Sequence, residues 1–113
     1  MSHHISFKAA FDGLKYALFT QPNFRIHLVA TALALSLAWL FKISQSELLI
    51  LLFTITLVLV AEMINTSIEA MTDLLSPTHH PQAKIAKDVA AGMVLLTASL
   101  SIIIGLAIFL PKF

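Results

Sequence analysis

The chain contains no cysteine, so disulfide bonds and thiolate chemistry are both excluded. Charged side chains are also scarce, because Asp, Glu, Lys and Arg make up only 12% of the 113 residues. A soluble domain of this length carries about twice that share of charge. Hydrophobic residues make up 58% of the chain, and its mean hydropathy of +0.91 is typical of a membrane protein.

Several familiar sequence patterns are missing as well. With only three glycines, the chain has no G-x-x-x-x-G-K-[ST] phosphate loop and no glycine-rich kinase loop. Any nucleotide site must therefore be built from helix ends and side chains. The net charge is +1 and no run of basic residues occurs, so nucleic acid is not an expected partner. The opening sequence MSHHISFKAAFDGL lacks an apolar core with a cleavage site, so we expect no signal peptide.

Three long apolar stretches predict helices that span a membrane. Each span needs about 20 residues, so the length allows one domain, residues 1–113, with about three spans. We expect the first helix over 24–41 and the second over 45–75. The third is expected to begin at Pro81 and to contain the uncharged run 89–111.

Two local signals support these boundaries. Pro22 and Pro81 suit the first position of a helix, where the missing N–H costs nothing. Ser44, followed three residues later by Glu47, matches a capping box at the start of the second helix.

Residues 5–19 predict a fourth, amphipathic helix. One face of this helix is apolar and the other is charged; the apolar face carries Phe7, Phe11, Leu14 and Leu18, and the charged face carries Lys8, Asp12 and Lys15. This pattern favours a helix that lies in the membrane interface, although a short core helix of a soluble protein shows it too. Because the rest of the chain is so apolar, we prefer the interface and expect an all-α integral membrane protein.

The basic residues near the span ends indicate the topology. On the side of the N-terminus and the loop 76–80, the chain has Lys8, Lys15, Arg25, Lys84 and Lys87; on the other side it has Lys42 and Lys112. Because basic residues accumulate on the cytoplasmic side, five against two predicts that the N-terminus and this loop are cytoplasmic. We therefore expect a multi-pass protein of the cytoplasmic (inner) membrane.

A polar stripe interrupts the second spanning helix. At 100° per residue, Glu62, Asn65, Glu69 and Asp73 occupy one face about 80° wide. Ionised side chains at membrane depth are expensive and normally face a bundle interior, where they have a function. A helix over 45–75 is about 45 Å long, against about 30 Å of hydrocarbon, so its acidic end reaches or passes the interface. Glu62 is then the deepest of these residues and Asp73 the shallowest.

These acids suggest phosphoryl transfer at the membrane surface. Lys87, near the start of the third span, can approach Glu69 and Asp73 because both helix ends lie on one side. Acids that hold a divalent cation beside a lysine suit a phosphate substrate. Glu62, the most desolvated acid, is best placed to take the proton of an attacking hydroxyl. Alternatively, the acids and lysines only pair to hold the helices together.

The sequence resembles the bacterial diacylglycerol kinase and undecaprenol kinase family of small integral membrane lipid kinases. The resemblance rests on AEMINTSIEAMTDLL, which contains E-x-x-N-x-x-x-E-x-x-x-D, and on HPQAKIAKDVAAGMVLL after a short loop. It covers essentially the whole chain, including Gly13-Leu14 and Ile26-His27. The form H-P-x-A-K-x-A-K-D-V-A-A-G is closer to the undecaprenol kinase branch.

The resemblance implies a role for each matched residue. Glu62 corresponds to the catalytic base on the lipid hydroxyl, and Glu69 to a ligand of the divalent cation, such as Mg²⁺, that accompanies ATP. Asn65 and Asp73 correspond to polar residues that shape the lipid and nucleotide sides of the site. Nucleotide contacts are implied for Thr78, His79, His80, Lys87 and Asp88. The family also assembles as a homotrimer with sites shared between subunits.

The chain departs from the family pattern at two positions. Gln21 stands where the family usually has a glutamate that is the second metal ligand, and an amide oxygen can coordinate only without charge. Ala9 stands where the interfacial helix usually has a tyrosine, which removes a likely nucleotide contact. Both positions face the polar stripe in the family.

Three further features allow more than one interpretation. Small side chains at Ala86, Ala90, Ala91 and Gly92 favour close helix packing, although these residues can equally leave room for a lipid headgroup. His79 and His80 suit a solvated loop better than a metal site with Glu69. We interpret His27 as a residue that snorkels or caps.

We therefore predict a lipid kinase that transfers the γ-phosphate of ATP to a lipid alcohol, undecaprenol first and diacylglycerol second. Glu62 is the predicted base, and Glu69 with Gln21 holds the cation. Two alternatives remain: a family member that binds lipid or nucleotide without turnover, and a small helical transporter or scaffold whose acids form a cation or proton relay.

Overall fold

The computed structural model describes residues 6–113, which are almost entirely helical. Its elements are α1 (Phe7–Thr20), α2 (Pro22–Phe41), α3 (Gln45–Leu75), α4 (Pro81–Phe109) and a short 3₁₀ turn, η1 (Leu110–Lys112). No strand occurs in this part of the chain, so the predicted all-α class is confirmed. The helix predicted over 5–19 begins at Phe7, and residue 5 lies outside the described residues. The first span begins two residues earlier than predicted, at Pro22, because proline suits the first helical position.

The helix ends follow from their capping residues. Ser44 Oγ accepts a hydrogen bond from the Glu47 backbone N–H at 3.1 Å, and the Glu47 carboxylate accepts one from the Ser44 N–H at 3.0 Å. This is the predicted capping box, and it satisfies two backbone donors that the helix leaves unpaired. Before it, Lys42 adopts the left-handed conformation (φ 51°) that ends α2 and reverses the chain.

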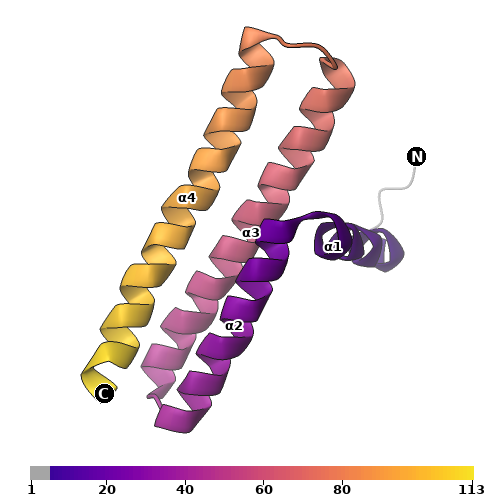
Figure 1. The fold of residues 1–113 in the computed structure, drawn as a ribbon. Coiled ribbons are helices and arrows are strands. Elements are labelled where there is room, and N and C mark those ends of the chain that lie inside the picture. Colours follow the sequence, from indigo (N-terminus) through magenta and orange to yellow (C-terminus); the bar gives the residue numbers. More distant parts are fainter. Residues whose placement is uncertain (1–5) are drawn as a thin grey trace.

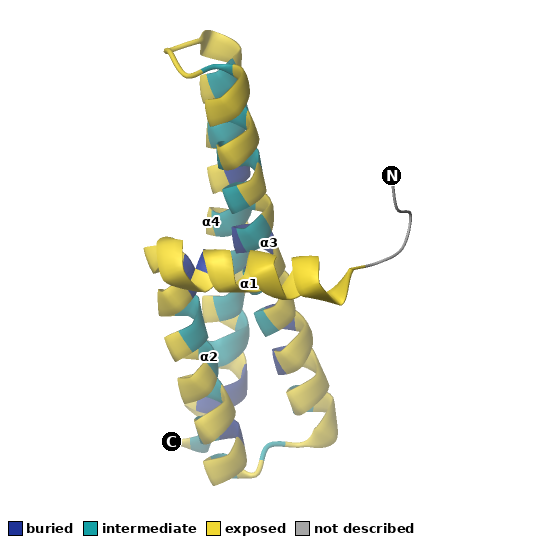
Figure 2. Cartoon of the chain, turned by 90° about the vertical axis from the view of Figure 1, so that its right-hand side faces the viewer, coloured by how far each residue is buried: buried dark blue, intermediate teal, exposed yellow. Residues whose placement is uncertain are grey.

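Figure 1 shows how the four helices are arranged. The two longest helices, α3 and α4, form an antiparallel hairpin, and α2 lies along the half of α3 that precedes Glu62. Helix α1 runs across this bundle at the level where α2 begins, roughly perpendicular to the other three (Figures 1 and 2). The amphipathic helix therefore lies in the orientation expected of a helix in a membrane surface.

The lengths of the helices set the depth of the polar stripe. Helix α2 has 20 residues, about 30 Å, which matches the hydrocarbon thickness of a bilayer. Helix α3 has 31 residues, about 45 Å, so the end of the α3–α4 hairpin extends well past the level of α1 (Figure 1). This places the acidic end of α3 at and beyond the expected membrane surface, as predicted.

The best-packed part of the chain lies at the opposite end from the α3–α4 loop. A cluster of buried residues joins α2, α3 and α4 there, namely Ala38, Leu51, Ile108 and Phe109. Lys112 Nζ closes this end by pairing with Glu47 Oε2 at 3.1 Å. Elsewhere Figure 2 shows mostly exposed and half-buried residues.

The outer surface is strongly apolar. Large side chains such as Trp39 (84% exposed) and Leu96 (73% exposed) point away from the bundle. Three helices, α2, α3 and α4 with its 3₁₀ extension, are long and apolar enough to cross a membrane. Because an exposed apolar surface of this extent suits lipid or neighbouring subunits and not water, the chain is a membrane protein.

Candidate active site

Burial along the polar stripe falls from Glu62 to Asp73. Glu62 is only 2% exposed, Asn65 and Glu69 are half-buried, and the Asp73 side chain is 65% exposed. The stripe therefore runs from the bundle interior outward to the surface beyond α1. This is the order of depth that the sequence predicts.

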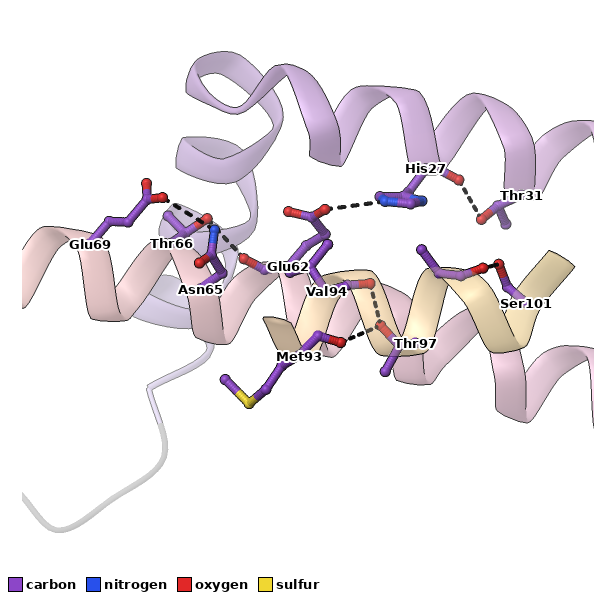
Figure 3. A network of polar contacts seen from close by, with 11 residues as sticks. His27, Thr31, Glu62, Asn65, Thr66, Glu69, Met93, Val94, Thr97 and Ser101 are labelled. Atoms are coloured by element: carbon purple, nitrogen blue, oxygen red, sulfur yellow. Dashed lines mark hydrogen bonds and ion pairs between the residues drawn. The ribbon is translucent and has the colours of Figure 1, made fainter. Parts of the chain in front are cut away.

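The deepest acid lies against a histidine from another helix. His27 Nε2 of α2 is 3.1 Å from Glu62 Oε1, and Figure 3 shows the two side chains directed toward each other. This is a close polar contact and not a hydrogen bond, and Glu62 Oε1 has no hydrogen-bond partner among residues 6–113. The His27 side chain is itself only 22% exposed.

The sequence interpretation missed this contact. His27 does not snorkel to the surface but turns inward to Glu62. A signal was present, because His27 precedes Lys42 by 42 − 27 = 15 residues and Glu62 follows Glu47 by 62 − 47 = 15 residues. Equal distances from one tight turn place both residues at the same depth in antiparallel helices.

One turn beyond Glu62, Asn65 is bonded to the next acid. Asn65 Nδ2 donates a hydrogen bond to Glu69 Oε1 at 3.3 Å (Figure 3). The amide oxygen of Asn65 is buried and accepts no hydrogen bond from the described residues. Among residues 6–113, Asn65 thus presents a buried oxygen atom whose hydrogen-bonding capacity is not used.

The outermost acid of the stripe pairs with α4. Lys87 Nζ is 2.5 Å from Asp73 Oδ1, so the predicted approach of Lys87 to Asp73 is observed. No hydrogen bond joins Lys87 to Glu69 in residues 6–113. Asp88 pairs with Lys84 one turn earlier on its own helix, also at 2.5 Å.

The loop between α3 and α4 forms one side of a surface pocket. This single pocket is lined by Asp73 and by all five residues for which nucleotide contacts are implied, namely Thr78, His79, His80, Lys87 and Asp88. Glu69, the predicted cation ligand, is not among its lining residues. Within the pocket, His80 Nδ1 also accepts the Gln82 backbone N–H at 3.1 Å and so caps α4. The sequence thus grouped residues that the fold does bring together.

Gln21 lies at the junction between α1 and α2. It is half-buried there, and its Nε2 donates to Thr20 Oγ1 at 3.2 Å. Across residues 6–113 no hydrogen bond connects Gln21 with Glu69. The same residues include no group of three or more His, Asp or Glu side chains suited to a metal ion, which gives no support to a metal site of His79, His80 and Glu69.

The small residues of α4 divide into two groups. Ala90 is 1% exposed and packs in the bundle, as the packing interpretation predicts. Ala91 and Gly92 are exposed, and a Cβ atom added to Gly92 would meet nothing within 4 Å. Ala9 is likewise exposed on α1. Ala91 therefore remains free to border a lipid headgroup.

Fold and site together define a small membrane-embedded helical protein with a buried acid beneath a charged surface pocket. The family model described as "Prokaryotic diacylglycerol kinase" matches residues 8–109. The chain belongs to this family of lipid kinases, which confirms the resemblance found in the sequence.

Three relatives illustrate the match. The undecaprenol kinase of Bacillus subtilis (strain 168) is 42% identical over 107 residues, covering 95% of this chain and 87% of the relative. The diacylglycerol kinase of Synechocystis sp. is 40% identical over 108 residues, covering 95% of this chain and 62% of the relative. The diacylglycerol kinase of Escherichia coli (strain K12) is 28% identical over 94 residues, covering 83% and 77%. The chain thus spans less than two thirds of the Synechocystis relative.

Proposed function

We propose that the chain transfers the γ-phosphate of ATP to the hydroxyl of a membrane lipid alcohol, and that undecaprenol is the acceptor. The observation that carries this proposal is a carboxylate withdrawn from water at membrane depth, Glu62, below a pocket lined by charged residues. A buried acid below the surface suits a hydroxyl held in the bilayer. A charged pocket above it suits a soluble nucleotide.

In this mechanism Glu62 is the general base. Its carboxylate takes the proton as the lipid hydroxyl oxygen attacks the γ-phosphorus, the bond to the bridging oxygen of ATP breaks, and ADP leaves. A general base contributes about 10²- to 10⁴-fold to the rate of such a step. The apolar outer surface next to Glu62 lets the lipid approach from the bilayer, and Asn65 and Ala91 border the headgroup.

The nucleotide binds in the pocket at the α3–α4 loop. Lys87 neutralises phosphate charge, and Asp73 and Asp88 hold the two lysines of α4 in place through their ion pairs. The loop residues Thr78, His79 and His80 line the same pocket and contact the nucleotide.

Glu69 is the proposed protein ligand of Mg²⁺. Mg²⁺ often binds through one or two carboxylates, together with water and substrate phosphates, so a single acid is sufficient. The unpaired, buried amide oxygen of Asn65 beside Glu69 fits a hard cation that prefers oxygen. Gln21 is the proposed second ligand, through its neutral amide oxygen. When bound, the cation supplies positive charge to the phosphates.

We also propose how the protein is oriented in the membrane and how its subunits assemble. Residues 1–113 form a single domain in the cytoplasmic membrane, with the N-terminus and nucleotide pocket on the cytoplasmic side. Five basic residues near the span ends on that side, against two on the other, support this orientation. We also propose a homotrimer, because the exposed apolar surface is extensive and the family that the sequence resembles assembles in this way.

The acceptor is chosen from the sequence and its relatives. The segment H-P-x-A-K-x-A-K-D-V-A-A-G and the 42% identity to the Bacillus undecaprenol kinase favour undecaprenol. The 40% identity to the Synechocystis diacylglycerol kinase makes diacylglycerol the second candidate.

The direct test uses purified protein in lipid vesicles with ATP labelled at the γ-phosphate. The proposal predicts labelled undecaprenyl phosphate formed faster than labelled phosphatidate when equal amounts of the two alcohols compete. Faster labelling of diacylglycerol would reverse the choice of acceptor. If neither lipid is labelled, a family member that only binds its ligands becomes the better account, and Gln21 in place of the usual acid is the feature that favours it.

A further inference from the structure

We infer that His27 is the positioning residue that keeps the Glu62 carboxylate ionised and directed for catalysis. This inference rests on the proposed function and deepens it, since His27 acts through Glu62. It begins from the 3.1 Å contact between His27 Nε2 and Glu62 Oε1, which joins α2 to α3 at membrane depth.

Glu62 needs a compensating partner to remain charged. Its side chain is only 3% exposed, and an isolated ionised carboxylate is strongly disfavoured away from water. Such a group stays ionised in a protein only when charges or hydrogen-bond donors replace the lost water. A base must be ionised before it can accept a proton, so the partner of Glu62 determines whether Glu62 can act.

His27 is the group that meets this need within residues 6–113. On α3 itself, Asn65 uses its amide N–H on Glu69, and Glu69 lies two turns away. On α4, Lys84 and Lys87 pair with Asp88 and Asp73 near the loop. The basic residue of α2 closest to His27, Arg25, donates to the carbonyl oxygens of Leu18 and Phe19 at the end of α1.

His27 borders an apolar region of the bundle. It lines a cavity of about 270 Å³ between α2, α3 and α4. The His27 backbone carbonyl accepts the hydroxyl of Thr31, which also lines this cavity (Figure 3). With apolar walls on one side, the ring's polar edge has Glu62 as its neighbour. A close contact that is not a hydrogen bond fits a catalytic pair that tightens when substrate binds.

The test combines kinetics with a measurement of protonation. His27→Leu removes the donor and His27→Gln keeps an N–H donor of similar reach. His27→Leu is expected to lower kcat by roughly tenfold to hundredfold, less than loss of the base itself, and to leave KM for ATP unchanged. His27→Gln is expected to keep most of the wild-type kcat. Ser36→Ala, which removes an exposed hydroxyl farther along α2, is the control and is expected to leave kcat unchanged.

Infrared absorption measures the charge on Glu62 without any turnover. In His27→Leu at neutral pH, a band of a protonated carboxyl group is expected that is absent from the wild type and from His27→Leu/Glu62→Gln. If His27→Leu keeps both wild-type kcat and an ionised Glu62, the inference is overturned. The inference is also overturned if His27→Leu and His27→Gln lose kcat equally and neither shows the carboxyl band. In that case His27 affects kcat through packing and not through the charge on Glu62.

Failure of the proposed kinase function and failure of the positioning role of His27 give different results. If wild-type protein labels no lipid, the proposed function fails, and the infrared band still decides whether His27 keeps Glu62 ionised. If the wild type is active and His27→Leu is equally active, the positioning role fails while the kinase function stands.

Discussion

Glu62 is the only acidic side chain among residues 6–113 that is buried. The other acids of the stripe are progressively more exposed, and each has a partner: Glu69 accepts from Asn65, and Asp73 pairs with Lys87. Burial therefore separates the roles of chemically similar residues. The acid in apolar surroundings is suited to proton transfer. The more exposed acids are suited to binding a cation or to pairing with lysine.

The loss of Lys87 is expected to weaken ATP binding. In Lys87→Met, Asp73 loses the positive side chain that pairs with it in the pocket at the α3–α4 loop. The unpaired Asp73 carboxylate then repels phosphate. The ATP concentration for half-maximal rate should rise about tenfold, which corresponds to about 1.4 kcal/mol. Steady-state kinetics with varied ATP measure this change. Lys112→Met, which breaks the Lys112–Glu47 pair at the other end of the bundle, is the control, and an equal rise in that variant would argue against a specific role for Lys87.

An acid at position 21 is expected to improve cation binding. Gln21→Glu adds a negative charge at the α1–α2 junction, where the present amide bonds to Thr20. If Gln21 is the second metal ligand, the Mg²⁺ concentration needed for half-maximal activity should fall by roughly tenfold, a gain within the range of one added charged ligand. Titration of activity with Mg²⁺ at fixed ATP measures it. Unchanged dependence on Mg²⁺ would remove Gln21 from the metal site.

At the scale of the elements, the length of α3 allows one helix to carry both a buried acid and exposed acids. One continuous helix of 31 residues starts at a capping box on one side, crosses the bundle, and carries its polar residues past the level of α1. Helix α4 returns along it and brings Lys87 to Asp73. The hairpin thus carries the surface pocket at the α3–α4 loop beyond Glu62 along α3.

The capping box is expected to contribute to stability and not to catalysis. Ser44→Ala removes the side chain that accepts the Glu47 N–H, and a change of this kind costs about 1 kcal/mol. Equilibrium unfolding in detergent micelles should show that loss, with kcat unchanged because the box lies at the far end of α3 from Glu62. Ser46→Ala provides the comparison, because Ser46 lies two residues after Ser44 and takes no part in the capping box. A similar destabilisation in both variants would show that the capping bonds are not the cause.

The elements were largely predictable from sequence, and the contacts between them were not. Prolines, the capping box and apolar periodicity are local signals, so the bounds of α3 agree with prediction at both ends. The residues that line the surface pocket at the α3–α4 loop could be grouped from sequence because they belong to two helix ends and one short loop, and their role toward a nucleotide stays a prediction. The contact of His27 with Glu62 depends on the register between two helices. Equal spacing from the α2–α3 turn indicates that register only when both sides of the turn are compared.

At the scale of the whole molecule, the chain is packed at one end and open along its sides. The buried cluster lies near η1 and the α2–α3 turn, whereas most large apolar side chains elsewhere face outward. A bilayer covers part of such a surface, and neighbouring subunits suit the rest. The proposed trimer agrees with this distribution of exposed apolar surface.

The trimer is expected to persist in mild detergent. Light scattering combined with size-exclusion chromatography, corrected for bound detergent, should give the mass of three chains. Substitution of an outward-facing small residue such as Gly92 by Leu tests whether α4 lies in the subunit contact, since Gly92 has open space around it within one chain. A monomer with full lipid kinase activity would contradict the proposed assembly.

The most direct test of the whole account is the rate of phosphate transfer in a Glu62→Gln variant. Glutamine keeps the size of the side chain and removes its ability to act as a base. With γ-labelled ATP and undecaprenol in vesicles, kcat should fall by about 10²-fold or more. Glu47→Gln, an acid on the same helix near the opposite end, should keep most of the wild-type kcat. Wild-type rates of lipid labelling in Glu62→Gln would contradict the account, because the buried carboxylate would then have no part in the reaction.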